Sequence, residues 1–94
     1  MGMELKIISP NGVVGPLECD SVHLFIADDA QEKMGGSYGI RQGHAEAVLV
    51  LDRGELSAFF ESKLLLQGIH SSGFATVEKN LVTVVAENFE EKSI

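Results

Sequence analysis

Short apolar segments separated by turn residues run through this sequence, and that punctuation constrains the fold more than any other feature. Residues 4–9 begin by alternating polar and apolar side chains, and Pro10-Asn11-Gly12 then supplies a turn signal. Residues 13–19 are expected to return as a strand at a sheet edge, because Pro16 cannot donate a ladder hydrogen bond. The β-branched run at residues 82–85 suits a pleated surface. The pattern predicts an all-β fold, a two-sheet β-sandwich of short antiparallel strands.

The other segments fit the same architecture. A strand at residues 21–27 places Val22, Leu24 and Ile26 on one wholly apolar face. Residues 28–39 lack a sustained period and predict an exposed loop with one helical turn at 30–34. Further strands are expected at 45–51, 56–60, 64–70, 74–78 and 81–86, with 45–51 buried and turning at 52–55 to pair with 56–60, and with turns at 71–73 and 79–80. The sandwich is expected to occupy residues 3–87, and the tail at 88–94 to begin a frayed helical turn.

Length and charge exclude several classes of function. The chain has 94 residues, and 14 acidic against 7 basic side chains give a formal net charge of −7. A chain of this size forms one small domain, without room for a large catalytic cleft. Its negative charge argues against binding to nucleic acid and against docking on an anionic lipid surface. No apolar run approaches the roughly 20 residues of a membrane-spanning helix. The single cysteine cannot form an internal disulfide, which favours a reducing, cytosolic-side location.

Residues that could carry chemistry lack the patterns that chemistry needs. Cys19 lies between two acidic residues that disfavour its thiolate, so we expect a small apolar core residue and no nucleophile. His23 has no zinc-ligand spacing around it. Ser72, His70 and Asp52 could be combined into a triad, but no nucleophile elbow is present. The sequence therefore predicts no catalytic residue, no metal site and no bound cofactor.

Two segments keep alternatives open. Lys33 could be the modified lysine of a small biotinyl or lipoyl carrier domain, which is the second function that we consider. At residues 39–45 two glycines bracket a polar bend that presents Arg41, Gln42 and His44 directly before a strand. This bend suits a recognition loop on a rigid scaffold, and it equally suits a simple connection with His44 as a hydrogen-bonded corner residue.

Three segments stand in an order that matches a known family. Residues 5–12, Leu-Lys-Ile-Ile-Ser-Pro-Asn-Gly, resemble a first strand with a Thr/Ser-Pro-x-Gly turn. Residues 36–45 resemble a Gly-x-x-Gly-Ile-Leu-Pro-Gly-His-Ala-Pro segment, with Gln42 in place of a proline. Residues 72–86 resemble Gly-Gly-Phe-x-x-Val-x-x-Asn-x-Val-Thr-Val-Leu-Ala, with Ser72 in place of the first glycine. Across residues 3–90 the chain thus resembles the N-terminal β-sandwich of the epsilon subunit of F-type ATP synthase.

The resemblance implies a rotor subunit without chemistry of its own. Such a subunit packs on the gamma subunit and rests by one end on the polar loops of the c-ring, coupling ion translocation to ATP synthesis or hydrolysis. It is peripheral, without direct lipid insertion, and is expected on the cytoplasmic face of the bacterial inner membrane. Family members usually continue into two C-terminal helices, and the chain stops where these would begin. From these residues we therefore expect neither an inhibitory clamp nor a nucleotide site.

Carried over position by position, the resemblance also implies the contact residues. The c-ring end is expected at Gly36, Ser37, Tyr38, Arg41 and Gln42, and the gamma side at His44, Ser72, Gly73 and Phe74. The chemistry suits this assignment, because a tyrosine is an amphipathic interface anchor and an arginine can pair bidentately with a partner carboxylate. Both Tyr38 and Arg41 are expected on an exposed loop, so that replacing either weakens the c-ring contact and leaves the fold intact.

Overall fold

The predicted all-β architecture is confirmed in a computed structural model, which describes residues 2–28 and 35–93. The described residues contain strands and no helix. The strands are β1 (Met3–Ser9), β2 (Gly12–Cys19), β3 (Ser21–Ile26), β4 (Gly36–Arg41), β5 (Ala47–Leu51), β6 (Gly54–Phe60), β7 (Lys63–His70), β8 (Gly73–Glu78), β9 (Leu81–Ala86) and β10 (Phe89–Lys92).

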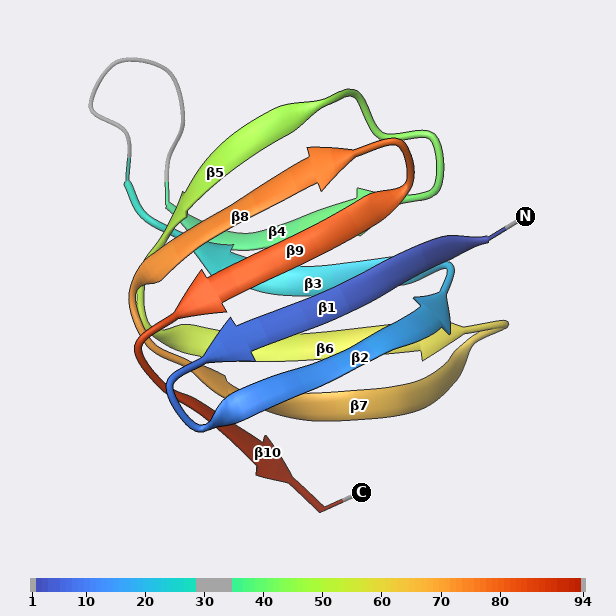
Figure 1. Ribbon diagram of the computed structural model, residues 1–94. Helices are drawn as coiled ribbons and strands as arrows, with labels where there is room; N and C mark the ends of the chain where they lie inside the picture. The colour runs from blue at the N-terminus through green and yellow to red at the C-terminus, as the bar shows by residue number, and fades with distance from the viewer. Residues whose placement is uncertain (1, 29–34, 94) are drawn as a thin grey trace.

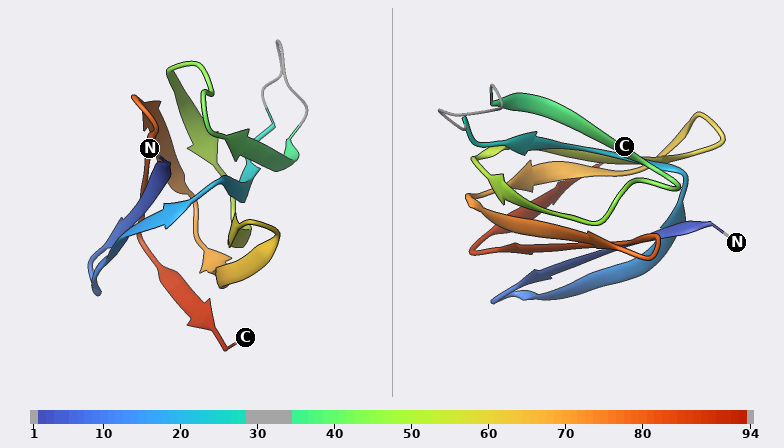
Figure 2. Two further views of the ribbon diagram at one scale, coloured as in Figure 1. Left: turned by 90° about the vertical axis from the view of Figure 1, so that its right-hand side faces the viewer. Right: turned by 90° about the horizontal axis from the view of Figure 1, so that it is seen from above.

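The strands form one curled sheet that folds into two layers (Figures 1 and 2). The path of paired strands is β10-β7-β6-β3-β5-β8-β9-β1-β2, and β4 pairs with β3 beside this path. We call β4, β3, β6, β7 and β10 the first sheet, and β5, β8, β9, β1 and β2 the second sheet. All pairs are antiparallel except β1 with β9, which is parallel. As the position of Pro16 predicted, β2 lies at the edge of the second sheet.

The chain passes between the two sheets where β5 leads into β6, and here the predicted hairpin is wrong. The two strands do not pair with each other but follow one another along the same side of β3, with Ile26 opposite Leu51 and His23 opposite Ser57. Between these pairs the Phe25 N–H has no strand partner, and it donates to Nε2 of His70 at 3.1 Å. The segments at 64–70 and 74–78 likewise belong to different sheets. A strand that bends to change sheets is the usual way of making a sandwich corner.

The core lies between the two sheets and follows the predicted alternation on β3. Val22, Leu24 and Ile26 are all buried, as expected. Strand β5 was predicted to be buried, but only one of its faces is: Leu49 is buried, whereas Val48 is 72% exposed. The other core side chains come from all the remaining strands, and β2 contributes through its last residue, Cys19. They are Met3, Leu5, Ile7, Cys19, Ile40, Leu51, Leu56, Ala58, Leu66, Ala75, Val77, Val82, Val84 and Phe89.

Strand β4 replaces the last part of the loop that the sequence predicted, residues 36–39. Its glycines hide the strand pattern, yet Gly39 stands opposite His23, where an added Cβ would lie 3.3 Å from the imidazole ring. The side chains of Tyr38 and Ile40 alternate toward the core in the same strand. This glycine thus leaves room for the His23 ring in a strand pair and does not mark a loop.

The tail also differs from its prediction. Residues Phe89–Lys92 form β10, which pairs with β7 and begins with Phe89 opposite His70. A helical turn is not formed here, because Phe89 is buried in the core and an extended chain satisfies the free edge of β7. The helical turn expected at residues 30–34, and Lys33 with it, lie outside the described residues.

Candidate partner interface

An apolar row crosses the outer face of the second sheet, which is the layer nearer the viewer in Figure 1. The register places Val50 opposite Phe74, Phe74 opposite Val85, Val85 beside Ile8, and Ile8 opposite Val13. One side chain thus comes from each of β5, β8, β9, β1 and β2. We call Val50, Phe74, Val85, Ile8 and Val13 the apolar row.

The apolar row is open to solvent over much of its length. Val50 is 64% exposed, Val13 57% and Phe74 45%, and Val48 adds a further exposed valine on the same face of β5. Scattered exposed apolar residues are ordinary, but a contiguous strip across a whole sheet marks an interaction surface. The chemistry that this arrangement offers is the exclusion of water against a complementary apolar partner.

Two hollows flank the apolar row on this face. One, of about 430 Å³, opens toward the end of the sandwich at which β8 begins, and it is lined almost wholly by apolar atoms of residues that include Ile8, Phe74 and Val85. The other, of about 360 Å³, lies at the opposite end between β5 and β8, with Glu46 and Glu78 on its rim. We name the two ends of the sandwich after their connections, the 71–73 end and the 42–46 end.

The sequence reasoning missed most of this surface. It singled out Phe74 but not Val48, Val50, Val13, Ile8 or Val85. A usable signal was present, because a strand with one face in water alternates apolar and polar residues, whereas residues 47–51 and 81–86 are apolar on nearly every position. Such runs indicate a strand that is covered on both faces.

The residues predicted for the c-ring end do not lie together. Gly36 begins β4 opposite Ile26, and Arg41 ends it opposite Ser21, so the two are roughly 16 Å apart along the strand. Gly36 and Ser37 belong to the 71–73 end, where Ile26 pairs with Leu51 and Leu51 with Gly73. Ser72, Gly73 and Phe74, predicted for the gamma side, lie at that same end.

Arg41, Gln42 and His44 share the 42–46 end, where Tyr38 reaches them from the middle of β4. The Tyr38 hydroxyl lies 3.0 Å from Nε2 of His44, and the two rings meet edge to face. Nδ1 of His44 lies 2.7 Å from the Ala45 carbonyl oxygen, to which it donates. His44 is therefore the hydrogen-bonded corner of the bend, and Tyr38 is a half-buried strand residue packed on the core. Placing Tyr38 on an exposed loop is wrong.

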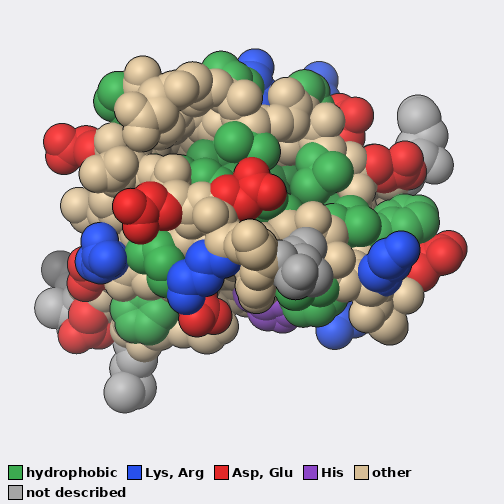
Figure 3. Space-filling model, turned by 90° about the horizontal axis from the view of Figure 1, so that it is seen from below, with side chains coloured by type: hydrophobic (Ala, Val, Ile, Leu, Met, Phe, Trp, Pro, Cys, Tyr) green, Lys and Arg blue, Asp and Glu red, His purple; other side chains and the backbone are tan. Residues whose placement is uncertain are grey.

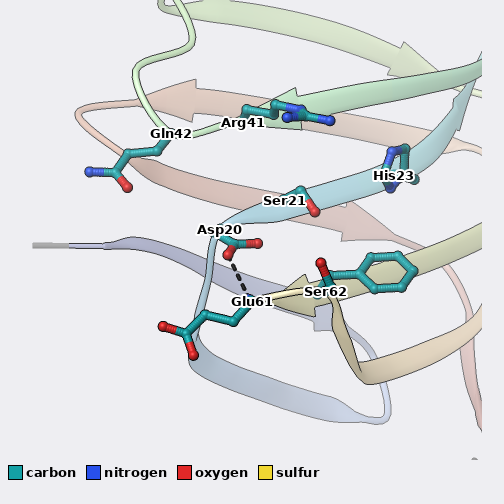
Figure 4. Close-up of a pocket in the computed structure, with 8 residues that line it drawn as sticks. Asp20, Ser21, His23, Arg41, Gln42, Glu61 and Ser62 are labelled. Atoms are coloured by element: carbon teal, nitrogen blue, oxygen red, sulfur yellow. Dashed lines mark hydrogen bonds between the residues drawn. The ribbon is translucent and has the colours of Figure 1, made fainter.

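A third hollow, of about 620 Å³, is open on the outside of the first sheet at the 42–46 end (Figure 4). Two of its lining residues have structural contacts: Asp20 accepts the Glu61 backbone N–H at 2.7 Å, and His23 packs edge to face on Phe59. In Figure 4 the Gln42 side chain points away from the other lining residues. The arrangement offers no nucleophile beside a base. Nor does any group of His, Cys, Asp and Glu within the described ranges suit a metal ion.

The other candidates for chemistry are structural. Both ring nitrogens of His70 are used, Nε2 by the Phe25 N–H and Nδ1 by the Ser71 carbonyl oxygen at 2.9 Å, so this buried ring is no base for Ser72. Cys19 is fully buried, and burial, with the nearby carboxylates of Asp20, Glu18 and Glu4 adding to it, raises the pKa of its thiol to about 11. The prediction that it is a core residue is confirmed.

A small apolar seam lies on the underside of the molecule, where β2 approaches β6 and β7. Leu17, Phe60 and Leu65 line a hollow of about 260 Å³ there. Figure 3 shows this side, with hydrophobic side chains gathered between acidic and basic ones. The seam is the open join of the curled sheet and is much smaller than the face that carries the apolar row. In the part of the chain that is described, no helix has the length and apolar character to cross a membrane.

One family model matches nearly the whole chain. Residues 2–92 match the family model described as ATP synthase, Delta/Epsilon chain, beta-sandwich domain. A chain of the Euglena gracilis mitochondrial ATP synthase, solved as OSCP/F1/c-ring in rotational state 1, superposes with a TM-score of 0.80 at 18% identity. A chain of the Tetrahymena thermophila mitochondrial ATP synthase, solved as central stalk and c-ring, gives 0.75 at 16% identity. No curated protein matches the sequence.

The two structural matches differ in how much of each chain they include. Both cover 96% of this chain, but only 53% of the Euglena chain and 66% of the Tetrahymena chain. The chain thus spans about half the length of the first of these proteins. At such low identity the likeness shows a shared β-sandwich fold.

Proposed function

We propose that this chain, which belongs to the family of ATP synthase delta/epsilon β-sandwich domains, is a non-catalytic rotor subunit that joins the gamma subunit to the c-ring. The observation that carries the proposal is the apolar row, because a rotor joint needs a large water-excluding contact and the chain offers one on a single face. The chain is then peripheral to the membrane, held there by the complex, and in a bacterium it lies on the cytoplasmic face of the inner membrane.

The gamma subunit covers the outer face of the second sheet in this proposal. Five strands at about 4.8 Å and three outward rows at about 6.6 Å give a face of roughly 500 Å². A stable interface needs about 800 Å² on each partner, so gamma must extend beyond the face. The bend at residues 42–46 is the natural extension, because it leads into β5 and Glu46 stands on the rim of the hollow beside Val48. We therefore keep His44 on the gamma side in this proposal, as the resemblance implied.

The c-ring meets the 71–73 end. In this proposal the contacts with gamma and with the ring adjoin on the chain, and the apolar row lies next to the 71–73 end through Phe74, Val13 and Ile8. Gly36 and Ser37 belong to the same end and stay in the proposed ring contact. Arg41 and Gln42 lie at the opposite end and are proposed to face gamma.

A carrier function gains no support. The comparisons match the chain to ATP synthase components over nearly its whole length. Nothing in them points to a modified lysine.

Binding to purified gamma tests the proposed face. Val50→Asp places a charge in the centre of the contact, and because Val50 is 64% exposed the variant should fold normally. We expect its affinity for gamma, measured by isothermal titration calorimetry, to fall at least about thirtyfold, since an unpaired charge is buried on binding. Gln67→Asp on the outer face of the first sheet is the matched control and should bind like the wild type. Equal affinities for both variants and the wild type would refute the face.

Cysteine cross-linking tests which end of the sandwich faces the c-ring. Cys19 is fully buried, so a cysteine introduced at Ser37 or at Gln42 is the reactive one. In the assembled complex, Ser37→Cys should cross-link to a cysteine in the c-ring polar loop, and Gln42→Cys should cross-link to gamma. The reverse pattern of cross-links would show that the 42–46 end, and not the 71–73 end, meets the c-ring.

A further inference from the structure

Asn80 joins three segments that are far apart in the sequence. It belongs to the two-residue turn between β8 and β9, in which Lys79 and Asn80 have φ values of 51° and 63°. Its side-chain Oδ1 accepts the Gly43 N–H at 2.9 Å, and its carbonyl oxygen accepts the Glu4 N–H at 2.8 Å. One residue therefore holds the bend at 42–46, the start of β1 and the β8–β9 turn together.

Gly43 takes a backbone conformation that favours glycine. Its φ is +84°, and apart from its chain neighbours no atom lies within 4 Å of the position that a Cβ would occupy there. The His44 N–H donates to the Arg41 carbonyl oxygen at 3.0 Å, which closes the turn on itself without attaching it to the second sheet. The hydrogen bonds of the His44 ring reach Tyr38, in the first sheet, and its own neighbour Ala45. Among these contacts, the bond from Gly43 to Asn80 is the one that ties the bend to the second sheet.

We propose that Asn80 is a positioning residue for partner binding: it fixes the bend at 42–46 in register with the apolar row, so that gamma meets one preformed surface. This inference rests on the proposed function. The physical reason is conformational entropy, because a bend that is free in the unbound protein must be ordered when the partner binds, and that ordering lowers the affinity.

The residue type fits this role. A two-residue hairpin turn of this kind needs φ above zero at both central positions, which Asn tolerates better than most residues. Glycine would also satisfy the turn but would offer no acceptor to Gly43. Aspartate would satisfy both requirements. We call the hydrogen bond from the Gly43 N–H to the Asn80 side chain the tie. Glycine and aspartate at position 80 therefore separate the effect of the turn from the effect of the tie.

The experiment compares Asn80→Gly, Asn80→Asp and the matched control Lys79→Gly, which alters the same turn and leaves the tie in place. Amide hydrogen exchange in the isolated protein reports the tie directly. We expect the Gly43 amide to exchange about tenfold faster in Asn80→Gly, and at wild-type rates in the other two variants. The Thr83 amide, in the middle of β9, serves as the internal reference and should not change.

Titration with purified gamma then measures how the loss of the tie changes the affinity for gamma. Asn80→Gly should bind roughly fivefold more weakly, while Asn80→Asp and Lys79→Gly should match the wild type. Unchanged Gly43 exchange in Asn80→Gly would overturn the tie. Faster exchange with unchanged affinity would overturn its role in binding. If wild-type protein fails to bind gamma at all, the proposed function falls, and the positioning role falls with it, whereas the exchange result stands as a separate reading of the free protein.

Discussion

Replacing His70 by leucine should destabilise the protein through the unpaired backbone it leaves at the sandwich corner. His70 is fully buried, and its Nε2 accepts the Phe25 N–H at 3.1 Å in the gap between β5 and β6, where β3 has no strand partner on that side. Leucine fills a similar volume but offers no acceptor, and a buried unpaired N–H costs about 1–3 kcal/mol. The Ser71 carbonyl also loses its donor at 2.9 Å. We expect a total loss of about 2–3 kcal/mol, from a stability of about 5–14 kcal/mol for a chain of this length.

Urea denaturation measures this loss, with an unchanged m-value as evidence that the native and unfolded states are otherwise alike. The melting temperature should fall by about 10–20 °C. His70→Gln is the matched control, since its side-chain oxygen can take the place of Nε2 and accept from Phe25. It should recover about 1 kcal/mol of the loss. If the leucine variant loses less than about 1 kcal/mol, or if both variants lose the same amount, the hydrogen bond at the corner is not what stabilises it.

Four further predictions follow from single contacts and from the burial of Cys19. Tyr38→Phe removes the hydroxyl that lies 3.0 Å from Nε2 of His44, and urea denaturation should show a loss of about 1 kcal/mol. Gly54→Ala would place a Cβ 2.3 Å from Cβ of Phe25, so the two strands must shift and thermal denaturation should reveal a loss of about 1–3 kcal/mol. Because burial raises the Cys19 thiol pKa to about 11, iodoacetamide at pH 8 should alkylate the native protein roughly a hundredfold more slowly than the unfolded chain. The raised pKa means that the native thiol keeps its proton longer, so stability should fall as pH rises from about 9 to about 11.

Local pattern was sufficient for most strands and for the turns that carry their own signal. The alternation on β3 gave the buried set Val22, Leu24 and Ile26, and Pro16 gave the edge position of β2. Strand β4 was missed because Gly39 lies against a neighbour, His23, that only tertiary pairing brings opposite it. Propensity treats glycine as a turn residue, whereas here Gly39 leaves room for the His23 ring within a strand pair.

The corner between β5 and β6 was beyond local reasoning for another reason. Residues 52–55 carry ordinary turn chemistry, which serves a hairpin and a change of sheet equally well. The choice depends on His70, 45 residues away from Phe25, which supplies the acceptor that the unpaired backbone needs. The apolar row depends on register in the same way. Val50 and Val13 lie at opposite ends of a row that three intervening strands must bring into line.

The two outer faces of the sandwich differ in a way that indicates which layer meets a partner. Across the first sheet the register aligns a polar row, Gly39, His23, Ser57, Gln67 and Lys92, which suits a face left in water. The second sheet is apolar on its inner face and, along the apolar row, on its outer face too. The fold needs only the inner set, because Val50 and Val13 are more than half exposed and add little to the stability of the isolated chain. The alignment of the apolar row across five adjacent strands therefore supports the proposal that gamma covers the outer face of the second sheet.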